Sequence, residues 1–270
     1  MVSETMSEPD PSFQRFRLLV AYDGRPYCGW QSQAAGDTIQ DRLLEALRSL
    51  CPDAKGLVGS GRTDAGVSAE GQVAHFDAPS SWKMNGENWR DALNTKLPKS
   101  IRIYACDATE PEFHARFSAK EKTYRYRIFT GQVLPPTLVG LAWHRRGTAS
   151  LDEWNTLLRL FEGEHDFRAL SANRNDGSDE GLDTRRVIFA ARAEQSVPNQ
   201  VDLRFTGNGF LYKMVRFLVG TTVYGIERRL STSEIEAFLS GKDPEKKAPY
   251  CAPADGLTLE RVDYPDTKID

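Results

Sequence analysis

The sequence LVGSGRTDAGVSAEGQVAHF, residues 57–76, is the most unusual stretch of the chain. Its glycines are Gly59, Gly61, Gly66 and Gly71. They lie between a predicted helix and a predicted strand, which requires the backbone to turn sharply there or to lie close to another segment. The turn displays an arginine and a carboxylate two residues apart, Arg62 and Asp64. The stretch therefore predicts a tight loop with a functional side chain on it.

Two phosphate-binding motifs can be tested on this loop, and both fail. A dinucleotide-binding GxGxxG motif that starts at Gly59 needs glycine where Asp64 stands. A Walker A loop from Gly61 to Gly66 needs lysine where Val67 stands. The sequence therefore does not predict a nucleotide cofactor.

The Arg62–Asp64 pair has two interpretations. One is a glycine-rich turn whose charges are solvated and have no chemical role. The other is a carboxylate that the nearby arginine keeps ionised, available as a nucleophile or a base on a sugar or base carbon.

Upstream of the loop, the sequence predicts one strand and one helix. Residues 15–23 alternate, which is typical of a half-buried strand. The stretch DTIQDRLLEALRSL has apolar residues at helical spacing, with Asp37 as the expected N-cap and Gln40 three residues later. The helix is expected to stop at Pro52.

Downstream, strands alternate with further helices. The expected strands are 71–77, 100–108, 122–130, 185–194, 201–206 and 256–264. Ser150 with Glu153, and Ser231 with Glu234, predict capping boxes of two helices. Residues 209–226 are apolar nearly all round and predict a buried helix.

This order of elements predicts an α+β fold. We expect two helix-backed, mostly antiparallel sheet subdomains with the active-site cleft between them. Residues 1–12 are expected to form a flexible tail, 13–114 an N-terminal subdomain that carries the Asp64 loop, and 115–270 a C-terminal subdomain.

Composition excludes several protein classes. The chain has 270 residues, 40% hydrophobic and 27% charged, which is a globular balance. No apolar run reaches the roughly 20 residues of a membrane-spanning helix. The polar, acidic N-terminus lacks the pattern of a signal peptide, so a cytoplasmic location is expected. The four cysteines and four histidines show neither a disulfide framework nor metal-ligand spacing, so no metal is expected.

The formal net charge of −3 argues against a nucleic-acid partner, whose binding surfaces are usually basic. The total hides local clusters, however. Arg145 and Arg146 are adjacent, and Lys213 lies three residues before Arg216. Positive strips on an acidic body are therefore expected.

Six stretches, in order, resemble the motifs of one family. They are YDGRPYCGWQSQ, TIQDRLLEAL, GSGRTDAGV, ALNTKLPKSIRI, FHARFSAKEKTYRYRI and NGFLYKMVRFLVGT. These stretches are similar to the conserved segments of the tRNA pseudouridine synthase A family, and together they cover nearly the whole chain. One residue departs from the family pattern, because Ser68 stands where the family usually has histidine after GV.

The resemblance implies the activity and its partners. The family isomerises uridine to pseudouridine at positions 38, 39 and 40 in the anticodon arm of tRNAs, without a cofactor, as a homodimer. It implies that Asp64 is the essential carboxylate and that Arg62 helps to evict the target base. Tyr124 is then the active-site tyrosine that stacks on uracil, and Arg216 the buried cation that pairs with Asp64.

Further residues are expected to contact RNA, mostly through its phosphates, which position an RNA without reading its sequence. They are Arg25, Gln72, Phe113, His114, Arg116, Lys122, Arg145, Arg146 and Lys213. Two alternatives stay open at this point. One is the same chemistry on another RNA or another position, and the other is a catalytically silent tRNA-binding protein.

Overall fold

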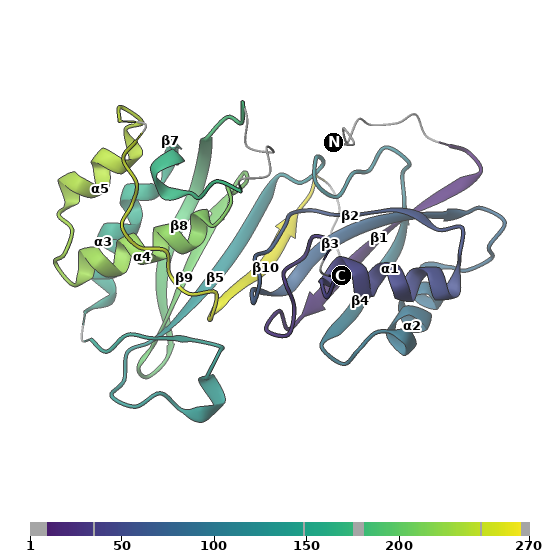
Figure 1. The fold of residues 1–270 in the computed structure, drawn as a ribbon, viewed down its shortest axis with the longest axis horizontal. Coiled ribbons are helices and arrows are strands. Elements are labelled where there is room, and N and C mark those ends of the chain that lie inside the picture. The colour runs from purple at the N-terminus through teal and green to yellow at the C-terminus, as the bar shows by residue number, and fades with distance from the viewer. Residues whose placement is uncertain (1–9, 35, 148, 175–180, 244, 266–270) are drawn as a thin grey trace.

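The computed structural model describes residues 10–34, 36–147, 149–174, 181–243 and 245–265 (Figure 1). Most of the expected N-terminal tail, 1–12, lies outside these residues. The strands are β1 (Phe13–Tyr22), β2 (Lys55–Gly59), β3 (Ser68–Pro79), β4 (Ile101–Thr109), β5 (Glu121–Phe129), β6 (Trp143–His144), β7 (Gly163–Asp166), β8 (Arg185–Val197), β9 (Gln200–Gly207) and β10 (Leu257–Asp263). The helices are α1 (Ile39–Leu50), α2 (Gly86–Lys96), α3 (Leu151–Leu158), α4 (Met214–Ile226) and α5 (Thr232–Leu239), with short 3-10 turns at Pro136–Leu138, Arg159–Phe161 and Arg168–Leu170.

One continuous sheet runs through the molecule in the order β4-β1-β3-β10-β5-β9-β8-β7, with β2 beside β3 and β6 beside β5. Its pairings are antiparallel except for β10 with β3 and β5 with β6. The predicted α+β class and mostly antiparallel sheet are confirmed. Helices α1 and α2 cover one half, and α3, α4 and α5 cover the other (Figure 1).

The C-terminal strand β10 joins the two halves. It pairs with β3 on one side and with β5 on the other. Gly71 permits the close approach, because a Cβ there would lie 2.4 Å from the Glu260 carbonyl oxygen. The seam therefore holds the Asp64 loop, which precedes β3, near Tyr124 on β5.

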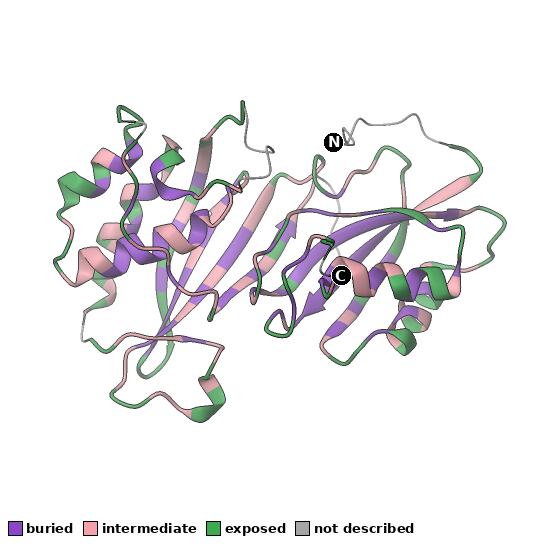
Figure 2. Cartoon of the chain, viewed as in Figure 1, coloured by how far each residue is buried: buried purple, intermediate pink, exposed green. Residues whose placement is uncertain are grey.

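The strands carry the expected alternation. Phe16, Leu18, Val20 and Tyr22 of β1 are all buried, as the pattern predicts. Figure 2 shows buried residues concentrated along the strands and on the inner faces of the helices. Within the described residues, no helix is long and apolar enough to cross a membrane.

Helix termini show where local signals were right and where one was wrong. Both predicted capping boxes are present, at Ser150 and at Ser231. The N-cap of α1, however, is Thr38 and not Asp37, which lies in the left-handed region at φ 66°. The Thr38 hydroxyl accepts from the Asp41 amide while the Asp41 carboxylate accepts from the Thr38 amide, so the capping box starts one residue later.

Helix α4 begins at Met214, five residues after the predicted start. Lys213 has a φ of 59°, a left-handed conformation that cannot continue into a helix. Residues 209–213 instead form a turn, and this turn reaches the cavity described below.

Candidate active site

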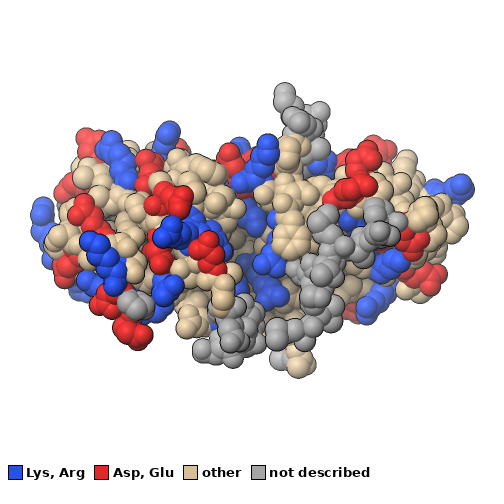
Figure 3. Space-filling model, turned by 90° about the horizontal axis from the view of Figure 1, so that it is seen from above, with Lys and Arg blue, Asp and Glu red and all other residues tan. Residues whose placement is uncertain are grey.

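A cavity of about 330 Å³ opens where the two halves of the molecule meet. Three segments form most of its lining: the loop at 58–64, strand β5 at Lys122 and Tyr124, and the turn and first residues of α4 at 210–216. Seen from above in Figure 3, Lys and Arg side chains gather in the hollow between the two lobes, with most acidic side chains towards the ends. The volume lies in the range of about 300–1,000 Å³ that is typical of small-molecule sites.

The N-terminal YDGRPYCGWQ segment positions the Asp64 loop. The Trp30 amide donates to the Thr63 carbonyl at 3.1 Å, and the Tyr22 hydroxyl shares a buried hydrogen bond of 2.8 Å with the Thr63 hydroxyl. Gly29 has a φ of 91°, and a Cβ there would lie 2.6 Å from the Thr63 carbonyl oxygen. Glycine is therefore required where this segment crosses the loop.

Gln72 fixes the other side of the loop from inside the protein. Its amide nitrogen donates to the Gly61 carbonyl at 3.0 Å, and its oxygen accepts from the Ser60 hydroxyl at 2.7 Å. Its side chain is fully buried. Both polar atoms of this side-chain amide are engaged inside the protein, and the contact of Gln72 with RNA stays a prediction.

Arg216 of α4 holds the Asp64 carboxylate. Its Nη1 lies 3.1 Å from Asp64 Oδ2, and its Nε donates to the Ala252 carbonyl at 2.7 Å. The two side chains are 16% and 14% exposed, so solvent screens this ion pair only weakly. One carboxylate oxygen is therefore fixed by a charge-assisted hydrogen bond from a residue 152 positions away in sequence.

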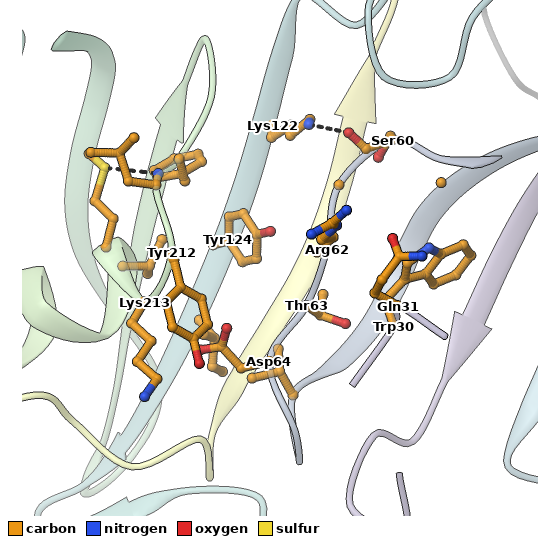
Figure 4. Close-up of a pocket in the computed structure, with 18 of the residues that line it drawn as sticks. Trp30, Gln31, Ser60, Arg62, Thr63, Asp64, Lys122, Tyr124, Tyr212 and Lys213 are labelled. Atoms are coloured by element: carbon orange, nitrogen blue, oxygen red, sulfur yellow. Dashed lines mark hydrogen bonds between the residues drawn. The ribbon is translucent and has the colours of Figure 1, made fainter. Parts of the chain in front are cut away.

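Tyr124 lies beside this pair in the same cavity (Figure 4). Its ring meets Phe210 edge to face, with 5.1 Å between the ring centroids. Burial raises the pKa of the Tyr124 phenol, and the neighbouring ionisable groups of Tyr22 and Asp64 raise it further. Tyr124 is therefore a neutral hydrogen-bond donor at neutral pH.

Arg62 and Lys122 both line the cavity, Arg62 from the Asp64 loop and Lys122 from β5 (Figure 4). Arg62 is exposed, whereas the Lys122 ammonium donates to the Ser60 carbonyl. Burial, and then the positive charge of Arg116, lower the pKa of Lys122 to about 8. Lys122 therefore ties β5 to the start of the Asp64 loop, across the seam between the two halves.

Because the pKa of Lys122 is lowered in the folded protein, the free energy of unfolding should depend on pH. Between pH 8 and 10.5, Lys122 is protonated in a larger fraction of unfolded chains than of folded chains. The free energy of unfolding therefore rises with pH in this range. Relative to Lys122→Met, the parent should gain about 3 kcal/mol of unfolding free energy between pH 7 and pH 11. Urea unfolding of both proteins at several pH values measures this difference. Exposed Lys120→Met is the control, and a Lys122→Met difference that stays constant across pH would contradict the assignment.

The cavity is strongly basic although the chain is acidic overall. The basic residues that line it are Arg62, Arg116, Lys122, Arg174, Lys213 and Arg216. Asp64 is the one acidic residue among the described residues of its lining. The cavity therefore presents a positive potential, suited to a polyanion, around a single carboxylate.

Three of the predicted RNA contacts lie elsewhere. Arg25 lines a second cavity and pairs with Asp23 at 2.7 Å. Arg145 pairs with Glu227, just beyond the C-terminal end of α4, about 16 Å along the helix from Arg216. Neither Arg145 nor the exposed Arg146 lines the Asp64 cavity. The fold places their segment at the other end of β5, so the predicted contacts of Arg145 and Arg146 with RNA phosphates stay a prediction for a surface outside this cavity.

Phe113 and His114 have structural contacts. Phe113 packs against Tyr264, with 5.1 Å between the ring centroids. His114 Nδ1 accepts from the amides of Arg116 and Phe117, which closes a tight turn. Their predicted contact with RNA is therefore not made through the cavity itself, whereas Arg116 of the same turn does line it.

Comparison with known proteins decides the family. A family model described as tRNA pseudouridine synthase matches residues 157–265. The chain is 46% identical to tRNA pseudouridine synthase A of Akkermansia muciniphila, over 93% of this chain and 96% of the relative. The same enzyme of Solidesulfovibrio magneticus is 41% identical (93% and 91% covered), and that of Geobacillus kaustophilus is 38% identical (94% and 95%). The chain belongs to the tRNA pseudouridine synthase A family.

The structure locates the one departure from the motifs of the tRNA pseudouridine synthase A family. The Ser68 hydroxyl accepts a hydrogen bond from the Gly24 amide at 3.0 Å. Ser68 lines the second cavity, beside Arg25, and not the Asp64 cavity. The departure from the family pattern therefore lies outside the lining of the Asp64 cavity.

Two lining residues were missed in the sequence. Arg174 and Tyr212 both face the cavity, and the guanidinium carbon of Arg174 lies 5.1 Å from the Tyr212 ring centroid. Arg174 belongs to no motif, and only the tertiary fold brings it to the site. Tyr212 stands inside the NGFLYKMVR motif, so its position next to Lys213 was a usable signal.

Metal chemistry has no ready ligand set in the part of the chain that the structure describes. Within those ranges, no group of three or more His, Cys, Asp or Glu side chains could hold a metal ion. The free thiols Cys28, Cys51, Cys106 and Cys251 are not among the residues that line the Asp64 cavity.

Proposed function

We propose that this protein isomerises uridine to pseudouridine in tRNA, at positions 38, 39 and 40 of the anticodon arm. The observation that carries the proposal is the Asp64 carboxylate, held by Arg216 beside Tyr124 in a basic cavity. Family membership supports the chemistry, and the relatives' names support tRNA as the substrate.

Substrate and product are isomers, so the reaction needs neither an oxidant nor a group donor. The N1–C1′ bond breaks, the uracil turns over, a bond forms between C5 and C1′, C5 loses its proton and N1 gains one. Two roles are open to Asp64: nucleophilic addition to the substrate, or removal of a sugar proton. Both require the ionised carboxylate, which the guanidinium of Arg216 stabilises at 3.1 Å.

Tyr124 is proposed to hold the uracil. Its ring is fixed by the edge-to-face contact with Phe210, so it offers a flat surface in a defined orientation. Because its phenol stays protonated at neutral pH, it can donate a hydrogen bond to the base and relay the C5 proton.

Arg62 is proposed to hold the RNA open. Removing a stacked base from an RNA helix costs a few kcal/mol, and a planar guanidinium can occupy the space that the base leaves. Arg62 is exposed at the edge of the loop that carries Asp64, where an entering nucleotide would meet it.

The basic lining predicts salt-dependent RNA binding, because phosphate contacts release counterions. For Arg174→Gln with Lys213→Gln, the slope of log affinity against log salt should shrink by about 1.4–1.8, since each lost phosphate contact removes about 0.7–0.9. The double variant Arg192→Gln with Arg228→Gln, at two exposed arginines that do not line the cavity, is the matched control and should keep the parent slope. Filter binding from 50 to 300 mM salt measures both. A control that loses as much slope as the test variant would place the RNA elsewhere.

A homodimer and a cytoplasmic location, which the family resemblance and the sequence lead us to expect, are part of this proposal. The described surface supports a protein contact on the segment between β5 and β6, where Val133 and Val139 are 80% and 60% exposed. Large exposed apolar side chains are common at subunit interfaces. The proposed division at residue 114 likewise fits the turn 113–118, which leads into β5.

The test of the proposed function is pseudouridine mapping in a panel of tRNA transcripts treated with the purified protein. We expect new pseudouridine at positions 38, 39 or 40 and none when the transcript carries cytidine there. Pseudouridine only at other positions, or only in another RNA, would keep the chemistry and overturn the proposed target. Tight tRNA binding without any pseudouridine would favour the catalytically silent protein.

A further inference from the structure

An aromatic side chain is exposed beside the Asp64 cavity. Phe117 is 52% exposed, in the turn 113–118 between β4 and β5. Its ring stacks on the His114 imidazole, with 4.4 Å between centroids and 29° between planes. The guanidinium carbon of Arg116 lies 5.4 Å from the Phe117 ring centroid. Phe117 thus belongs to a flat stack that is open to solvent and flanked by a positive charge.

The turn that carries Phe117 is fixed on both sides of the seam. The Ala115 amide donates to His75 Nδ1 of β3 at 3.1 Å, and the Ala115 carbonyl accepts from the Tyr264 hydroxyl, next to β10, at 2.6 Å. Burial, and then the charges of Arg15 and His114, lower the pKa of His75 to about 3. His75 is therefore neutral at neutral pH, and its Nδ1 can accept the hydrogen bond from the Ala115 amide.

Contacts within the turn fix the ring itself. The Ser118 amide donates to the His114 carbonyl at 2.9 Å, and the His114 amide donates to the Ser118 hydroxyl at 3.0 Å. His114 Nδ1 also accepts from the Phe117 amide at 3.3 Å, so the imidazole is held in the plane on which Phe117 stacks. An exposed apolar ring thus has a rigid support, which reduces the conformational entropy that a binding partner would have to remove.

The position of the turn indicates what this ring meets. Arg116, the neighbouring residue, lines the Asp64 cavity, and its charge acts on Lys122 in the same lining. An RNA strand that inserts one nucleotide into the cavity carries its adjacent nucleotides past the rim. Every nucleobase has a flat π-face, and stacking on an aromatic side chain next to cations is the usual way to hold unpaired bases.

We propose that Phe117, supported by His114, is a stacking platform for an unpaired nucleobase that flanks the target uridine. This inference rests on the proposed function, which supplies the RNA. It assigns Phe117 a positioning role, because the ring does not line the cavity in which the chemistry occurs. The alternative is that Phe117 contacts an apolar protein surface instead of a nucleobase. The variants at Phe117 distinguish these two partners.

The test compares Phe117→Leu and Phe117→Trp with the parent, on a transcript that the parent modifies. Leucine keeps the apolar character but removes the π-face, so the KM for RNA should rise about tenfold while kcat stays within about twofold. Tryptophan should bind as well as the parent. Phe189→Leu is the matched control, because Phe189 is similarly exposed, at 49%, on β8 and does not line the cavity.

A second readout uses RNA with 2-aminopurine in place of a nucleotide flanking the target. Its fluorescence should be quenched by the parent and by Phe117→Trp, and much less by Phe117→Leu at saturating protein. Parent-like KM and quenching in Phe117→Leu, or an equal loss in Phe189→Leu, would overturn the platform. If the parent binds this RNA but forms no pseudouridine, the proposed function fails, while the quenching comparison still decides the role of Phe117.

Discussion

Arg216→Gln should lower single-turnover pseudouridine formation by on the order of 10²- to 10³-fold, about 3–4 kcal/mol in the barrier. The Arg216 guanidinium lies 3.1 Å from Asp64 Oδ2, and both side chains are mostly buried. Removing one partner of such a pair leaves a carboxylate without its charge partner and free to rotate. Arg216→Lys should be milder, because the positive charge survives while the second donor, to Ala252, is lost.

A matched control separates catalysis from stability. Arg15 pairs with Asp77 at 2.7 Å, with exposed fractions of 20% and 15% against 16% and 14% for Arg216 and Asp64. Arg15→Gln should therefore cost similar unfolding free energy and leave the single-turnover rate near that of the parent. Equal losses of rate in the two variants, measured where both are folded by circular dichroism, would mean that Arg216 acts only through stability.

The sequence predicted those elements that depend on residues close together in the chain. The capping boxes at Ser150 and Ser231 depend on side chains three residues apart, and both formed. The alternation in β1 and β5 likewise reports burial directly. The α1 cap was misassigned because Asp37 and Thr38 are both good N-cap residues, and only the backbone geometry at Asp37 separates them.

Local sequence signals do not predict which strands pair when they are far apart in the sequence. Nothing in residues 257–263 indicates that β10 is the strand that lies between β3 and β5 and joins the two halves of the sheet. Helix α2 was not predicted, because its 11 residues bury only Trp89 and Leu93. Parallel pairing of β10 with β3 involves two residue pairs, too few for a pattern in the sequence.

The candidate site likewise contains residues that the sequence predicts and residues that only the fold reveals. The family motifs named Asp64, Arg62, Tyr124 and Arg216, and the fold brings all four to one cavity. The burial of Gln72 could not be predicted, because a polar residue in a motif can contact RNA or the protein interior. The sequence could not place Arg145 and Arg146 relative to Asp64, because a charge cluster does not reveal which end of a strand it occupies.

Asp64→Asn carries the largest expected effect. Asparagine keeps the size and polarity of the side chain but removes its charge and nearly all of its nucleophilicity and basicity. Arg216 would keep its bond to the Ala252 carbonyl, so the fold of the site should survive. We expect tRNA binding within a few-fold of the parent and turnover lower by on the order of 10⁴-fold or more, about 5 kcal/mol in the barrier.

Asp77→Asn is the matched control for this substitution. Asp77 is as deeply buried in an ion pair as Asp64, 15% against 14% exposed, but it does not line the cavity. Its loss should reduce stability and leave turnover near that of the parent.

The most direct test of the account is single-turnover tritium release from C5-tritiated uridine in tRNA, since C5 must lose its hydrogen when it bonds to C1′. The parent and Asp77→Asn should release tritium rapidly, whereas Asp64→Asn should release almost none while it still retains the tRNA in a filter-binding assay. Tritium release by Asp64→Asn at a rate near that of the parent would contradict the assignment of the chemistry to this carboxylate.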